Sequence, residues 1–310
     1  MTGLRGWGVL ALLLAAATWF VPEGARAFPD EPNSLDEGAN AHDKRFQILG
    51  ELAVFGGRIE GDAKVKALLS PLFQVRFQLA KHWILDTAWG FSYINLRDQA
   101  NDTTSNSFRP GNPWAAIHYQ GVKGQFSYRF GVGMTAPVAR LPDEINTPDN
   151  TTAVAAYSLA AALRGNTSYW LWDPHSISVI VPLAFERRKP NGFLWGANLS
   201  TGIMLKCCGS ESARNLNQRN DPVVELGSVM AYQAVNWLRV GSTFTLAILP
   251  RGIGIAGNQK TQLALQPFMR FGSEDAFASV GVVINLDDPW GFSFDKEQVW
   301  GLRIGGGAAF

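Results

Sequence analysis

The sequence predicts an all-β protein, an antiparallel up-and-down transmembrane β-barrel of about twelve strands. Three observations predict it: apolar and polar residues alternate along many segments, these segments are long, and the links between them are alternately short and long. The 310-residue chain is 46% hydrophobic and 12% aromatic, and it contains 32 glycines. Abundant glycine and aromatic residues with few helix-period stretches favour strands over a helical bundle.

Charge and cysteine content exclude several classes of protein. The chain has 27 basic and 26 acidic residues, a balance that argues against nucleic acid as a partner. Two cysteines cannot staple a disulfide scaffold, and without a C-x-x-C pattern they predict no structural zinc site. The adjacent pair, Cys207 and Cys208, leaves open a vicinal disulfide or a soft-metal ligand. We assign the pair no site, and we expect no metal and no cofactor.

The first 27 residues have the pattern of a secretory signal peptide. Arg5 is a short basic start, Val9–Val21 is an apolar run, and Ala25-Arg26-Ala27 is a small-x-small cleavage site. The run is shorter than the ~20 residues that a membrane-spanning helix needs, which argues against an anchor. We expect cleavage after Ala27, a loose N-terminal segment over 28–45, and the barrel over 46–310.

Twelve runs from Phe46 onward are predicted to be strands. In Phe73-Gln74-Val75-Arg76-Phe77-Gln78-Leu79 the odd positions are apolar and the even positions are polar. Successive side chains of a strand point to opposite faces, so each run has one apolar wall and one polar or small wall. The expected runs are 46–58, 68–80, 83–96, 113–120, 124–136, 175–187, 192–206, 222–234, 237–249, 261–271, 275–287 and 298–310.

Strand and link lengths separate a membrane barrel from a soluble sandwich. Sandwich strands are typically ~5–6 residues long, whereas a tilted strand across a bilayer needs ~9–11. All runs but the fourth meet the longer requirement, and short links alternate with long links such as 59–67, 97–112 and 137–174. Bacterial barrels have short periplasmic turns and longer external loops, so both ends of the barrel are predicted on the short-turn side.

Aromatic residues lie where interfacial girdles would place them, at strand ends or on the apolar wall. The alternative is that they are ordinary core residues. These aromatics are Trp83, Trp89, Tyr93, Tyr119, Trp195, Trp237, Trp290 and Trp300.

The last predicted strand ends on Phe310, which has the same parity as Trp300, Leu302 and Ile304. It resembles the terminal strand of Gram-negative outer-membrane β-barrel proteins, whose final Phe is read by the barrel-insertion machinery. The Gly111-Asn112-Pro113-Trp114 segment is similar to barrels of the hydrophobic-compound type, the phenol-degradation-associated and fatty-acid channels. The resemblance implies an outer-membrane location, with the lipid bilayer, lipopolysaccharide and the insertion machinery as partners and an unknown small-molecule cargo.

The wall opposite the apolar one predicts what the lumen contains. It carries Glu51, Arg76, Asp86, Arg129, Glu186, Glu225, Arg239, Arg270 and Arg303. Charged groups are expensive in hydrocarbon, so these side chains are expected to face inward. Six of them lie near short turns, in the periplasmic third: Arg76, Asp86, Arg129, Glu186, Arg239 and Arg270. They predict either an electropositive constriction that selects solutes or a paired network that closes a narrow lumen.

The 137–174 link is the longest. Thr151–Leu163 is alanine-rich and permits a short helix, with Asn150 or Thr151 as the expected cap. Tyr169, Trp170 and Trp172 follow as an aromatic cluster. We expect the link either to fold into the mouth as a gate or to pack on its neighbours at the outer rim.

Catalytic residues are not evident. Outer-membrane acyl hydrolases hold a His and a Ser two residues apart on the lipid-facing wall, and His175 has the matching height and parity. However, Ile177 stands two residues on, and Ser176 and Ser178 point to the opposite wall. His118 has lumen parity and no evident catalytic neighbour. The Gly252–Gly257 segment matches G-x-G-x-x-G, but no helix pattern follows it.

We therefore expect a non-enzymatic outer-membrane channel or transporter. Small molecules would diffuse through a lumen that the periplasmic arginine cluster narrows. The alternatives are a closed structural or adhesive barrel with its external loops as the working surface and, less favoured, an acyl hydrolase.

Overall fold

The computed structural model describes residues 46–56, 63–98, 102–144, 147–189, 192–208, 220–248, 261–273, 275–287, 294 and 299–310. Within them the chain forms one thirteen-stranded antiparallel sheet. The strands are β1 Phe46–Gly56, β2 Ala63–Ala80, β3 Trp83–Asp98, β4 Thr103–Pro110, β5 Trp114–Lys123, β6 Phe126–Thr135, β7 Ser176–Arg188, β8 Phe193–Lys206, β9 Asp221–Val235, β10 Leu238–Ile248, β11 Thr261–Gly272, β12 Ala276–Asn285 and β13 Trp300–Ala309.

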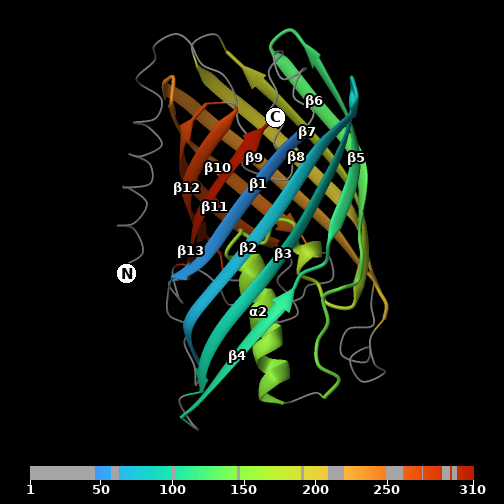
Figure 1. Ribbon diagram of the computed structural model, residues 1–310, viewed down its shortest axis with the longest axis vertical. Coiled ribbons are helices and arrows are strands. Elements are labelled where there is room, and N and C mark those ends of the chain that lie inside the picture. Colours follow the sequence, from blue (N-terminus) through green and yellow to red (C-terminus); the bar gives the residue numbers. More distant parts are fainter. Residues whose placement is uncertain are drawn as a thin grey trace.

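The sheet closes on itself as a twelve-strand barrel, because β4 and β5 share one position in its wall. Both pair with β3: β5 with the half near the short turn and β4 with the outer half. β1 pairs with β2 on one side and with β13 on the other. Phe46 and Phe310 exchange two backbone hydrogen bonds of 3.3 and 2.8 Å at this junction. Figure 1 shows the cylinder with the C-terminus near its upper, short-turn end.

The side chains of the barrel are arranged in the opposite way to those of a soluble protein. In β2 the apolar Phe73, Phe77 and Leu79 are exposed, whereas Gln74 and Arg76 are buried. Trp83 and Trp237, next to short turns, are also exposed. An apolar outer band with aromatic residues near its edge is the surface that a bilayer covers. Trp290 lies outside the described residues, as do residues 1–45 and the Gly252–Gly257 segment.

Strand β4 was not predicted. Its sequence, Thr103–Pro110, is polar on both faces, so the alternation that identifies the other strands is missing. β4 pairs with β3 alone in the sheet and packs against helix α2 inside the barrel. The 97–112 link is therefore largely strand, and it ends where Gly111, Asn112 and Pro113 separate β4 from β5.

Helix α2 spans Pro148–Ala162, slightly earlier than the predicted 151–163. The expected cap, Asn150 or Thr151, was wrong. Thr147 is the N-cap, its side chain accepting a hydrogen bond from the Asn150 N–H at 3.3 Å. Pro148 fits the first turn because its missing N–H is not needed there. Among the described residues, no helix is long and apolar enough to cross a membrane.

Candidate functional site

Residues 136–175, here called the plug, turn into the barrel and fill its outer half. In Figure 1, α2 lies inside the lower part of the cylinder, beside β4. Trp170 and Trp172 of the plug are each 1% exposed and pack with inward-facing Leu72 and Trp114 of the wall. The predicted aromatic cluster therefore lies within the lumen and not at the outer rim. A gating role for Tyr169, Trp170 and Trp172 stays a prediction.

Arg164 joins the plug to three strands of the wall. Its Nε lies 3.0 Å from Oε1 of Glu51 on β1, and its terminal nitrogens donate to Oγ and the carbonyl of Ser70 on β2 at 2.9 and 2.6 Å. Arg303 of β13 binds the other oxygen of the Glu51 carboxylate. The guanidinium also lies over the Trp172 ring, 5.1 Å from its centroid. Burial lowers the pKa of Arg164 to about 10, against the opposing effect of Glu51, so Arg164 is charged at neutral pH.

The opposite side of the plug is held by strands β8 and β9. Glu225 of β9 accepts hydrogen bonds from the backbone N–H groups of Ser168 and Tyr169, at 2.9 and 3.2 Å. These N–H groups begin a short 3₁₀ helix, Tyr169–Leu171, and a carboxylate is favoured at a helix N-terminus. Lys206 of β8 binds both carboxylate oxygens of Asp173 at 2.5 and 2.7 Å.

Asn112, in the break between β4 and β5, ties the wall to the plug. Its side-chain amide donates to the carbonyls of Trp170 and Asp173 at 3.1 and 2.7 Å, and its side-chain oxygen accepts from the Ala139 N–H at 2.8 Å. Its backbone N–H donates to the Leu171 carbonyl at 2.7 Å. The break in the strand frees this backbone N–H from the sheet and makes it an attachment point for the plug.

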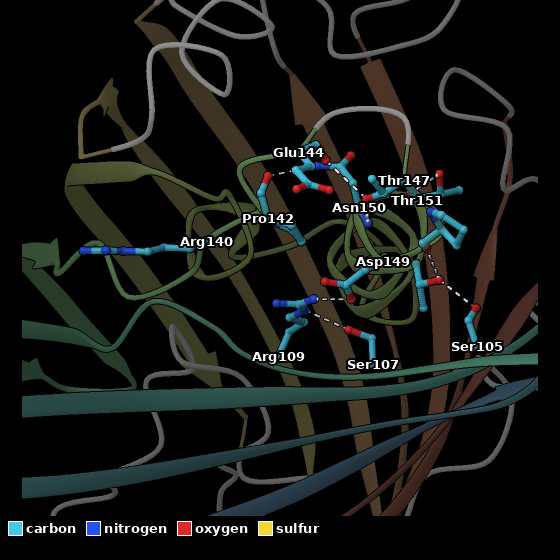
Figure 2. A network of polar contacts seen from close by, with 12 residues as sticks. Ser105, Ser107, Arg109, Arg140, Pro142, Glu144, Thr147, Asp149, Asn150 and Thr151 are labelled. Carbon is cyan, nitrogen blue, oxygen red and sulfur yellow. Dashed lines mark hydrogen bonds and ion pairs between the residues drawn. The ribbon is translucent and has the colours of Figure 1, made fainter.

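The outer end of the plug is fixed to β4, as Figure 2 shows. Arg109 binds Asp149 in the first turn of α2 at 2.6 Å and the Ser107 hydroxyl at 2.7 Å. Ser105 contacts Thr152 of the helix at 2.8 Å. Helix α2 is therefore attached along its length to the strand that sequence patterning misses.

The six predicted lumen charges are all buried, each with at most 4% of its surface exposed: Arg76, Asp86, Arg129, Glu186, Arg239 and Arg270. The structure brings three of them together, because Asp86 lies 3.3 Å from Arg76 and 3.9 Å from Arg129.

The other three predicted charges lie elsewhere on the wall. Arg239 and Arg270 are directly paired across β10 and β11. Arg239 binds Gln233, and Arg270 lies over the Phe277 ring at 3.7 Å. Glu186 accepts from Arg188 at 2.5 Å. The cluster is thus two groups, and its four arginines exceed its two carboxylates.

The histidines do not form a catalytic site in the described part of the chain. His175 was expected on the lipid-facing wall, and this was wrong, because it is only 8% exposed. Its Nε2 accepts a hydrogen bond from the Leu141 N–H at 2.9 Å, which draws the ring against the plug. Ser176 is buried and donates to the Asp173 carbonyl. His118 is fully buried and faces the lumen, as its parity predicts.

Cys207 and Cys208 are free thiols at the end of β8. Among the described residues, no group of three or more His, Cys, Asp or Glu side chains is placed to hold a metal ion.

The residues that hold the plug were mostly missed by sequence reasoning. Arg164 carries the available signal, because it is the single charged residue in the otherwise uncharged stretch between Asn150 and Pro174 except for Asp173. Asn112 carries a weaker signal, since a Gly-Asn-Pro segment also suits an ordinary turn.

This architecture defines a class: a twelve-strand barrel with an apolar outer surface and a polar, plugged interior has the fold of outer-membrane channels. One solved structure of this fold is the NanC porin, which is 9% identical and superposes with a TM-score of 0.51 over 85% of this chain and 100% of that one. Another is an outer membrane channel from Pseudomonas putida F1, 10% identical, with a TM-score of 0.51 over 92% of this chain and 100% of that one. At these identities the likeness is one of fold. No protein-family model and no curated protein matches the sequence.

Proposed function

We propose that this protein is an outer-membrane channel for small molecules, which pass through a lumen narrowed by the plug and by the inner charged cluster. The observation that carries the proposal is the closed barrel whose exposed face is apolar and whose buried face holds charged and amide side chains. Such a wall suits lipid outside and polar solutes inside. Two solved barrels of the same fold, described as a porin and as an outer membrane channel, support it.

The inner charged cluster would make the passage selective for anions. Four arginines and two carboxylates face the lumen near the short turns, so positive charge is in excess there. Fixed charges in a narrow, low-dielectric passage attract counter-ions and repel ions of the same sign. We therefore expect anions to carry more of the current than cations.

Planar-bilayer recording tests this proposal. The wild-type barrel should show discrete conductance steps and a reversal potential that favours chloride in a potassium chloride gradient. Arg76→Gln or Arg239→Gln should shift the reversal potential towards cations. Arg97→Gln is the matched control, because Arg97 is an exposed arginine that pairs with Asp102 at the outer end of β3. An equal shift in the control would contradict a role for the lumen cluster.

A second candidate is a closed structural or adhesive barrel, and the firm attachment of the plug favours it. The plug is held by buried ionic contacts from Glu51, Glu225 and Lys206 on separate strands. A silent bilayer for the wild type and for variants that release the plug would establish this candidate. Conductance that appears in the wild type would dismiss it.

Export and membrane assembly belong to the same proposal. Residues 1–27 would direct the chain across the inner membrane and be removed after Ala27, which N-terminal sequencing of the exported protein tests. Phe310 would be read by the barrel-insertion machinery, and lipopolysaccharide would surround the outer end of the barrel.

A further inference from the structure

A cavity of about 490 Å³ lies in the lumen, lined by the five adjacent strands β2, β1, β13, β12 and β11. On its outer side is the Glu51–Arg303 pair, where Arg164 of the plug is bound. On its inner side is Phe277, the ring that Arg270 covers. The cavity therefore lies between the plug and the charged cluster, on the route that the proposed function assigns to solutes.

The cavity exists because the wall carries glycine where a side chain would point inward. Gly281 and Gly305 both line it. A Cβ built at Gly305 would lie 3.0 Å from the Ser279 hydroxyl and would project into this space. Glycine weakens a strand interior, and it often marks a place where a ligand comes close to the backbone. The glycine run 305–307, which fits no phosphate-binding loop, thus has a local consequence: it keeps the lumen wall bare.

Two polar side chains face the cavity without partners. Gln74 is 7% exposed, and among the described residues neither its amide nor the Ser279 hydroxyl has a hydrogen-bond partner. A buried amide that lacks a partner is costly, so such a group is usually completed by water or by a ligand. Leu49, Leu72 and Phe268 supply an apolar surface beside these two groups.

The charges in the lining are already used. Arg303 donates to the Glu51 carboxylate and to Gln266, and Glu51 also binds Arg164. A charged ligand would have to displace one of these buried contacts, whereas a neutral one would not. The groups left for a ligand are therefore one amide, one hydroxyl and an apolar surface.

We infer that this cavity is a binding site for a small uncharged molecule with an apolar body and a hydroxyl or carbonyl group. The polar group would bond to Gln74 and Ser279, and the body would lie against Leu49, Leu72 and Phe268. The inference deepens the proposed function, on which it rests, by naming the class of solute that pauses in the lumen.

Binding of cyclohexanol to the barrel in lipid nanodiscs, measured by saturation-transfer NMR with empty nanodiscs as the blank, tests the site. Cyclohexanecarboxylate and cyclohexylammonium share its ring and differ in charge. We expect the alcohol to bind at least tenfold more tightly than either ion. Gln74→Leu, which keeps the size of the side chain, should weaken alcohol binding about tenfold, as expected for one lost hydrogen bond to a buried group.

Gly305→Val should abolish binding by filling the cavity. Gly50→Val is the matched control, because Gly50 is on the outer face of β1 at the same height and its built Cβ meets nothing within 4 Å. If Gly305→Val does not assemble, Gln74→Leu and Ser279→Ala, which add no bulk, decide the result. Unchanged binding in these variants, or equal binding of the carboxylate, overturns the site.

Conductance of the same preparations separates the site from the channel. A barrel that binds cyclohexanol and passes no ions would overturn the channel and leave the site. A barrel that conducts and does not bind the alcohol would overturn the site and leave the channel.

Discussion

At the scale of single residues, buried charge does most of the positioning. Arg164 and Glu51 are 113 positions apart, yet their contact joins the plug to the first and last strands of the barrel. Neither partner can be removed without leaving the other in a low-dielectric site. The same reasoning applies to Lys206 and Asp173, which are 8% and 1% exposed.

Arg164→Met should destabilise the plug more than any exposed change. It leaves Glu51 with Arg303 alone, and breaking a buried pair costs about 3–5 kcal/mol. We expect larger or more frequent current steps in a planar bilayer as the plug loosens. Arg97→Met is the control, since an exposed pair contributes about 0–1 kcal/mol. Identical currents in wild type and Arg164→Met would show that the plug does not limit the passage.

Asn112→Leu should also loosen the plug. The change keeps the size of the side chain but removes three hydrogen bonds, to Trp170, Asp173 and Ala139, at a cost of about 1–3 kcal/mol for the buried groups left unsatisfied. Limited proteolysis of the barrel in nanodiscs should then cut within 136–175 where the wild type resists. Asn106→Leu, in the exposed part of β4, is the comparison, and equal resistance of the two variants would count against the role of Asn112.

At the scale of elements, predictability follows the alternation of side chains. Every strand with a lipid-facing apolar wall was found from sequence, and the inward direction of Arg76, Asp86 and Arg129 followed from the same parity. β4 lacks this wall because one of its edges faces α2, so period-two patterning has no reason to persist there. The plug contacts depend on side chains that meet across the lumen, such as Ser168 with Glu225, and no local pattern encodes such a meeting.

The C-terminal strand gives a prediction at this scale. Phe310→Ala should lower the amount of folded barrel in the outer-membrane fraction several-fold, because the residue proposed to be read during insertion is gone. Refolding of the purified chain into lipid vesicles, where no machinery acts, should be nearly unchanged. Phe271→Ala removes an aromatic ring exposed near a short turn and serves as the control. Equal loss in cells and in vesicles would assign Phe310 to stability alone.

At the scale of the whole molecule, the barrel depends on lipid around its apolar band. Phe73→Arg, near the middle of β2, should cost about 2–4 kcal/mol, whereas Leu79→Arg, beside the short turn, should cost about 0–1 kcal/mol. Both positions are about half exposed, at 55% and 50%, so depth in the bilayer is the variable that differs. Urea unfolding in vesicles measures both. Equal costs would mean that the outer face is not held at different depths in hydrocarbon.

The seam between β1 and β13 has a consequence for biogenesis. It joins the first described strand to the last, so it is the contact with the greatest distance along the chain, and such contacts form slowly. Until β13 has been synthesised, β1 keeps an uncovered rim of backbone donors and acceptors that invites association with foreign strands. A ribosome that stalls before Trp300 would therefore release an adhesive half-pipe, which the cell must shield or destroy.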